Sequence, residues 1–115
     1  MLPAAHRLRT AELLTVLKRH QSVFGGGVTF KYLRHNSEKS EELSHFAFVV
    51  PSKAVKRAVD RNLLKRRARH AVSKYVARCR PGYWGVFFLS ASLLKIPAAV
   101  LEQTISRLLH QAKII

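Results

Sequence analysis

Between Lys53 and Arg80 the chain reads KAVKRAVDRNLLKRRARHAVSKYVARCR, and the other predicted elements are arranged around this stretch. It holds eleven of the 21 lysine and arginine residues, one acid, Asp60, and no glycine or proline. Its apolar residues recur at helical spacing. They are Leu64, Ala68, Ala71, Val72, Tyr75 and Cys79. The pattern predicts a helix from about Ala58 that ends at Pro81-Gly82, with most of its cations off the apolar face.

The cations of this stretch repel one another, because several pairs sit four residues apart. These pairs are Arg57/Arg61, Arg61/Lys65, Lys65/Arg69 and Lys74/Arg78. Each like-charge pair costs an isolated helix ~0.2–0.5 kcal/mol. An ordinary solvated face mixes signs, so this face indicates a polyanionic partner. Arginine favours phosphate, since its guanidinium matches phosphate oxygens. The small apolar face favours packing on a sheet over insertion into a membrane surface.

Composition sets the class of protein. The chain has 115 residues, a hydrophobic content of 48% and a formal charge of +15, which predicts one domain over 1–115. The single Cys79 excludes an internal disulfide and a CxxC zinc site, so a reducing, cytoplasmic setting is expected. No apolar run approaches 18 residues, and the N-terminal sequence does not resemble a signal peptide, so no membrane contact is expected.

The rest of the chain predicts a small sheet. Thr10 is a candidate cap for a helix over 11–20, with Glu12 in its first turn. Further predicted elements are strands over 28–34, 45–50 and 83–89 and a last helix from Pro97, with stripe Leu101, Ile105, Leu108 and Ala112. The polar segment 35–44 predicts a hairpin-like connection of the first two strands, and the glycines at 25–27 should stop regular structure. Strand 83–89 is apolar throughout, as in a central strand covered on both faces. The fold class is therefore α+β, a small mixed sheet packed with helices in the order α-β-β-α-β-α. A further short strand near 22–26 is compatible with the sequence.

Residues 51–72, PSKAVKRAVDRNLLKRRARHAV, resemble the signature of the bacterial ribonuclease P protein component family, roughly K-x-x-x-R-A-x-x-R-N-R-x-K-R-x-x-R-E. The residues in register are Lys53, Arg57, Ala58, Arg61, Asn62, Lys65, Arg66 and Arg69. The segments HRLRTAELLTVLKRH, FKYL and YWGVFFLSAS resemble the flanking helix and strands of the family. The resemblance implies a ribosomal protein S5 domain 2-like fold with a left-handed βαβ crossover.

The chain departs from the family pattern at four positions. Leu63 stands where the third residue of R-N-R is arginine, and His70 where a glutamate follows the last arginine. Leu14 and Lys18 stand where the first helix of the family offers two phenylalanines to the substrate. Aromatic stacking at those two positions is therefore lost, and Lys18 is a candidate phosphate contact.

The resemblance implies a subunit of a ribonucleoprotein that removes the 5′ leader from precursor tRNA. Its RNA subunit hydrolyses the phosphodiester with Mg2+ that it largely binds itself, and one protein is expected per RNA. The implied contacts to the RNA subunit are Lys53, Arg57, Arg61, Asn62, Lys65, Arg66 and Arg69. The implied contacts to the single-stranded leader are Leu14, Lys18, Tyr32 and Lys53.

No catalytic or metal-binding group is expected in the protein itself. The six histidines are scattered, no carboxylate pair suits a two-metal site, and Ser52 and Ser73 have no recognisable base. Two other classes of protein share the composition: a non-catalytic ribosomal RNA-binding protein, and a nucleoid protein that binds duplex DNA. The spaced pattern around Asn62 favours the ribonuclease P protein over both.

Overall fold

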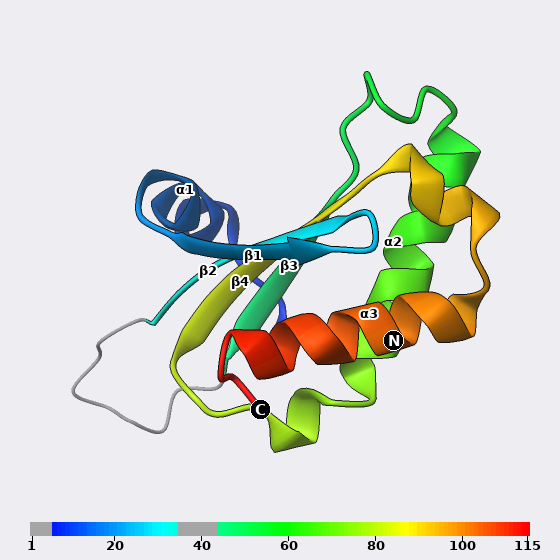
Figure 1. Cartoon of the computed structure of the whole chain (residues 1–115). Helices are drawn as coiled ribbons and strands as arrows, with labels where there is room; N and C mark the ends of the chain where they lie inside the picture. The colour runs from blue at the N-terminus through cyan, green and yellow to red at the C-terminus, as the bar shows by residue number, and fades with distance from the viewer. Residues whose placement is uncertain (1–5, 35–43) are drawn as a thin grey trace.

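The computed structural model describes residues 6–34 and 44–115, so most of the predicted connection over 35–44 lies outside the described residues. A four-stranded mixed sheet in the order β1-β2-β4-β3 lies at the centre, with α1 on one face and α2 and α3 on the other (Figure 1). The strands are β1 (Gln21–Gly25), β2 (Val28–Arg34), β3 (His45–Val49) and β4 (Tyr83–Leu89). The helices are α1 (Thr10–Lys18), α2 (Ala58–Ser73) and α3 (Ala98–Gln111), with short 3-10 helices η2 (Val76–Arg78) and η3 (Ala91–Lys95).

The predicted order is confirmed, with β1 as one additional strand where the sequence left room for it. Gly26 and Gly27, with φ of 58° and 84°, form the two-residue turn between β1 and β2, and Gly25 pairs with Val28. Two consecutive positive φ angles suit a tight hairpin and favour glycine. The glycines therefore join two strands, and the expectation that they stop regular structure was wrong.

The predicted hairpin-like pairing of strands 28–34 and 45–50 is wrong, because β4 lies between them. β4 pairs antiparallel with β2 and parallel with β3. β4 is the most continuously apolar strand, and its residues from Gly85 to Phe87 are buried. The centre of the sheet covers such a strand on both sides and both faces, whereas a β2–β3 hairpin would leave it at an edge.

The main core lies between the sheet and the two helices α2 and α3. Phe30 and Phe87 stack there with ring centroids 4.2 Å apart. The helical residues of this core are Leu64, Ala68, Ala71, Val72, Leu101, Ile105, Leu108 and Leu109. The predicted stripes are thus confirmed from Leu64 to Val72 in α2 and from Leu101 to Leu108 in α3. Val16 of α1 and Val86 of β4 are also buried but lie outside this cluster, on the α1 side of the sheet.

Two helix boundaries differ from the prediction. Arg9, and not Thr10, is the N-cap of α1, and its backbone N–H donates to Glu12 Oε1 at 2.9 Å. α2 ends at Ser73, where the hydroxyl donates to the His70 carbonyl at 2.6 Å. The N–H of Tyr75 donates to the Val72 carbonyl at 2.9 Å and closes the next turn. Tyr75 and Cys79 therefore pack against the core from outside the helix.

Candidate nucleic-acid interface

The apolar residues of α2 face the core, so the cations of this helix lie on its outer face. Asn62, Arg66 and Arg69 are exposed on the outer face, and Lys65 is half-buried beside them. Asn62, Arg66 and Arg69 line one groove of about 960 Å³, which also reaches Phe48 on β3. The fold thus brings together three of the predicted RNA contacts. Arg7 and His70, which sequence reasoning did not place there, line the same groove.

The segment 51–57 leads into α2 and carries three further exposed cations, Lys53, Lys56 and Arg57. The N–H groups of Ala54 and Val55 both donate to the Pro51 carbonyl at 3.0 Å, which makes the segment a tight turn. Arg57 Nε lies 3.9 Å from Asp60 Oδ2, a loose pair at the protein surface. The cations of this turn therefore remain available to a partner.

Arg61 differs from the other predicted contacts, because its guanidinium already has partners within the protein. Its Nη1 donates to the carbonyl oxygens of Val55 at 2.9 Å and Lys56 at 2.8 Å. Val55 is buried, and Arg61 is half-buried. Arg61 therefore connects α2 to the turn that displays Lys56, and sequence spacing alone could not reveal this role.

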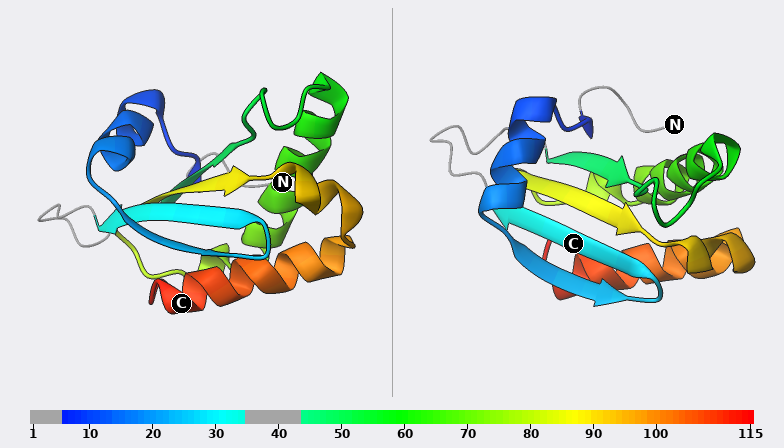
Figure 2. Two further views of the ribbon diagram at one scale, coloured as in Figure 1. Left: turned by 45° about the horizontal axis from the view of Figure 1, so that its top comes forward. Right: turned by 90° about the horizontal axis from the view of Figure 1, so that it is seen from above.

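The face of the sheet on the α1 side is only partly covered. α1 crosses it at one end, and the segment 51–57 lies at the other end, as the right-hand view of Figure 2 shows. We use the term open sheet face for the half-buried Lys31, Val49 and Phe88 between them. Lys31 Nζ lies 4.9 Å from the centre of the Phe88 ring, which is a cation–π arrangement. Sequence reasoning missed Lys31, although its alternation with buried Phe30 could have placed it opposite the core.

The predicted leader contacts do not all lie together. Leu14, with a relative exposure of 54%, and Lys18 are on the exposed part of α1. Tyr32 lies on the opposite side of the sheet, where its ring stacks on Phe30 with centroids 5.3 Å apart. Burial, and to a smaller degree Tyr83, raise the pKa of the Tyr32 phenol. The structure therefore places Leu14 and Lys18 on the helix that crosses the open side of the sheet, and Tyr32 on the other side.

The described residues do not suit a metal centre. Among residues 6–34 and 44–115 no three His, Cys, Asp or Glu side chains are grouped so that they could hold a metal ion. Burial raises the pKa of the Cys79 thiol to about 11, and the thiol donates to the Tyr75 carbonyl at 3.4 Å. Within the same residues, no helix has the length and hydrophobicity needed to cross a bilayer.

The fold and this surface define a small basic α+β protein whose exposed cations suit the phosphates of RNA. A family model described as Ribonuclease P matches residues 2–113. The chain belongs to the ribonuclease P protein family, which confirms the resemblance seen around Asn62. The family also identifies RNA as the partner of the chain.

Curated relatives and solved structures agree with this membership. The chain is 33% identical to the ribonuclease P protein component of Synechococcus elongatus, with 99% of this chain and 95% of the relative covered. It is 31% identical to that of Acholeplasma laidlawii, with 90% and 85% covered. The RNase P protein of Staphylococcus aureus superposes with a TM-score of 0.79 at 17% identity, over 95% of this chain and 96% of that one. The protein from Thermotoga maritima gives 0.77 at 20% identity, over 91% and 96%. The fold is thus shared with both.

Proposed function

We propose that this chain, as one domain over residues 1–115, is the protein subunit of a cytoplasmic ribonuclease P that removes the 5′ leader from precursor tRNA. One protein binds one RNA subunit, and the RNA subunit carries out the hydrolysis. The observation that carries the proposal is the outer face of α2, where Asn62, Arg66 and Arg69 of the family motif are exposed side by side.

The outer face of α2 and the turn 51–57 bind the RNA subunit. Lys53, Arg57, Lys65, Arg66 and Arg69 neutralise phosphates, and Asn62 donates to and accepts from polar groups of the RNA. Arg61 contributes by holding the turn in place through Val55 and Lys56. Asp60 is the one acid between 53 and 80, and Glu102, which lines the groove, is paired with Lys74 at 2.9 Å, so the cations of this surface remain attractive to phosphate.

The open sheet face binds the single-stranded leader. Leu14 and Lys18 are exposed on α1, which crosses this side of the sheet at one end, and Lys53 is exposed on the turn 51–57 at the other end. Lys31 offers a charge to a phosphate, and the Phe88 ring offers an apolar platform to a base. Tyr32 is not part of this surface, because its ring belongs to the core on the side of α2 and α3. Its contact with the leader stays a prediction.

Mg2+ belongs mainly to the RNA subunit in this proposal. Mg2+ takes oxygen ligands from carboxylates, phosphates and water. The described residues group no carboxylates for it, whereas the phosphates of a large RNA supply many oxygens. The protein supports catalysis by neutralising RNA charge, which lowers the concentration of Mg2+ that the RNA needs.

A reconstitution experiment tests the proposal. A bacterial ribonuclease P RNA and precursor tRNA are mixed with the purified protein, and cleavage is followed across a magnesium titration. We expect the protein to lower the magnesium requirement and to tighten the binding of precursor tRNA. A protein that does neither, although it is folded, contradicts the proposal. The variant Arg66→Ala/Arg69→Ala should restore the magnesium requirement of the RNA alone, whereas Lys95→Ala/Arg107→Ala, outside both surfaces, should not.

A further inference from the structure

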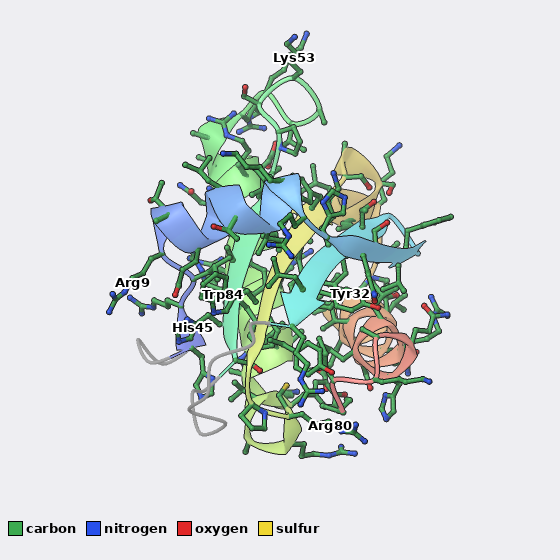
Figure 3. The ribbon with its side chains drawn as sticks, turned by 90° about the vertical axis from the view of Figure 1, so that its left-hand side faces the viewer. Arg9, Tyr32, His45, Lys53, Arg80 and Trp84 are labelled. Carbon is green, nitrogen blue, oxygen red and sulfur yellow. The ribbon has the colours of Figure 1, made fainter. Side chains whose placement is uncertain are left out.

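A second cationic groove lies at the end of the sheet where β2 ends and β4 begins. It has a volume of about 880 Å³ and shares no lining residue with the groove on α2. We call it the end groove and define it by Arg19, Tyr32, Arg34, Tyr83 and Lys113. Figure 3 shows Lys53 and Arg80 at opposite ends of the molecule, with Tyr32 between them. The end groove is therefore well separated from the turn that leads into α2.

The cations of the end groove come from separate elements. Arg19 follows α1, Arg34 ends β2 and Lys113 follows α3. All three are exposed, and none of them forms an ion pair within residues 6–34 and 44–115. No carboxylate among the described residues lines the groove either. Three like charges that line one groove, with no carboxylate beside them among the described residues, disfavour the folded state unless an anion binds between them.

The two tyrosines give the groove an aromatic wall. The Tyr32 ring is held by Phe30, so it is fixed in position, and Tyr83 is half-buried. The Tyr32 phenol lines the groove and can donate a hydrogen bond to a phosphate oxygen. Aromatic rings flanked by arginine and lysine are the features that bind single-stranded nucleic acid, whose bases are free to stack.

We propose that the end groove binds a short stretch of single-stranded RNA, with phosphates at Arg19, Arg34 and Lys113 and a base against Tyr83. The inference deepens the proposed function, because it adds a third RNA-binding surface, at the far end of the sheet. The spread of three cations over separate elements suits successive phosphates of a chain better than one free phosphate ion. An acidic peptide would use the charges but not the aromatic wall.

Binding of a fluorescently labelled octauridine to the isolated protein tests the site. The test variant is Arg19→Gln/Arg34→Gln, and its control of equal charge is Lys95→Gln/Arg107→Gln, at exposed residues outside both grooves. For the test variant we expect the log–log salt slope to fall by about 1.4 and the affinity at 0.1 M salt to fall at least about tenfold. The control variant should keep most of the salt slope and most of the affinity. Tyr83→Leu should also weaken octauridine, and circular dichroism should show that all variants are folded.

Two further measurements identify the RNA. If the groove holds the leader, Arg19→Gln/Arg34→Gln weakens precursor tRNA but not leaderless tRNA in the assembled holoenzyme. If it holds the RNA subunit, the variant weakens assembly instead. Either result supports the site. Equal octauridine binding by the test and control variants overturns it, as does hexaglutamate binding as tight as octauridine. A wild-type protein that binds octauridine but does not assist a ribonuclease P RNA leaves the site intact and contradicts the proposed function alone.

Discussion

Arg61 holds the backbone of Val55, with its Nη1 2.9 Å from the Val55 carbonyl oxygen. The same nitrogen donates to Lys56, so one guanidinium stabilises the turn that carries several exposed cations. A hydrogen bond from a charged donor typically contributes about 1.5–3 kcal/mol. Arg61 therefore acts on RNA binding through its neighbours as well as through its own charge.

Replacing Arg61 should accordingly cost more than one phosphate contact. For Arg66→Ala we expect the log–log salt slope of binding to the RNA subunit to fall by about 0.7–0.9. For Arg61→Ala we expect a larger fall, because Lys53, Lys56 and Arg57 lose their fixed positions. Hydrogen exchange of the free protein should show faster exchange at the Val55 amide in Arg61→Ala only. Identical slopes and identical exchange in the two variants would contradict the role of Arg61.

Lys31 is expected to act on the leader. Lys31→Ala removes the cation that lies over Phe88 on the open sheet face. The affinity for precursor tRNA with a leader should fall about fivefold, which corresponds to about 1 kcal/mol. Binding of leaderless tRNA should not change. Filter binding with the assembled holoenzyme measures both, and Lys95→Ala is the control. A loss that is equal for the two substrates would exclude a specific contact to the leader.

Lys113 is expected to limit stability, because it has a φ of 60° directly after α3. The N–H groups of Lys113 and Ile114 bond back to His110 and Leu109, both at 3.0 Å, so the left-handed conformation closes the helix. This conformation costs a residue with a side chain roughly 1–2 kcal/mol. Lys113→Gly should therefore raise the free energy of unfolding by about 1 kcal/mol in urea titrations, and the loss of one of the repelling cations of the end groove acts in the same direction. A lower stability would contradict this account.

Gly85 is expected to tolerate no side chain. A Cβ at this position would overlap the Phe30 ring and lie 3.3 Å from Phe46 Cδ1. Gly85→Ala should lower the free energy of unfolding by roughly 1–3 kcal/mol, since overpacking displaces core rings. Gly25→Ala is a matched control, because its Cβ would meet only Arg107 Nη2, at 3.4 Å. Denaturant titration of both variants compares them, and equal stabilities would argue against the tight packing at Phe30.

The Cys79 thiol should make the free energy of unfolding fall at high pH. Burial raises the pKa of its thiol from 9.0 to about 11, so the folded state favours the protonated thiol. This contribution to stability is present below pH 9 and is lost as the pH rises from 9 to about 11. The decline in unfolding free energy over this range should be smaller in Cys79→Ala. In the folded protein, alkylation by iodoacetamide at pH 8 should be slow, and unfolding should accelerate it. Fast alkylation of the folded protein would contradict the burial.

The helices were predictable because their signals are local. The spacing of Leu64, Ala68, Ala71 and Val72 set the inner face of α2, and hence the outer position of Arg66. The apolar run of β4 likewise indicated a central strand. The end of α2 was not predictable, because no proline or glycine marks Ser73 and the chain must turn there to start β4 beside β3.

The sequence by itself determined the basic face of α2 and a polyanionic partner, since charge and helical period are properties of neighbouring residues. The family motif around Asn62 then implied that this partner is RNA. Only the tertiary structure decided which strands pair, because pairing joins residues far apart in the chain. It also decided that α1 covers the side of the sheet that bears Lys31 and not the side that bears Tyr32. Alternation along β2 places these two residues on opposite faces, but the helix that covers each face is chosen by packing.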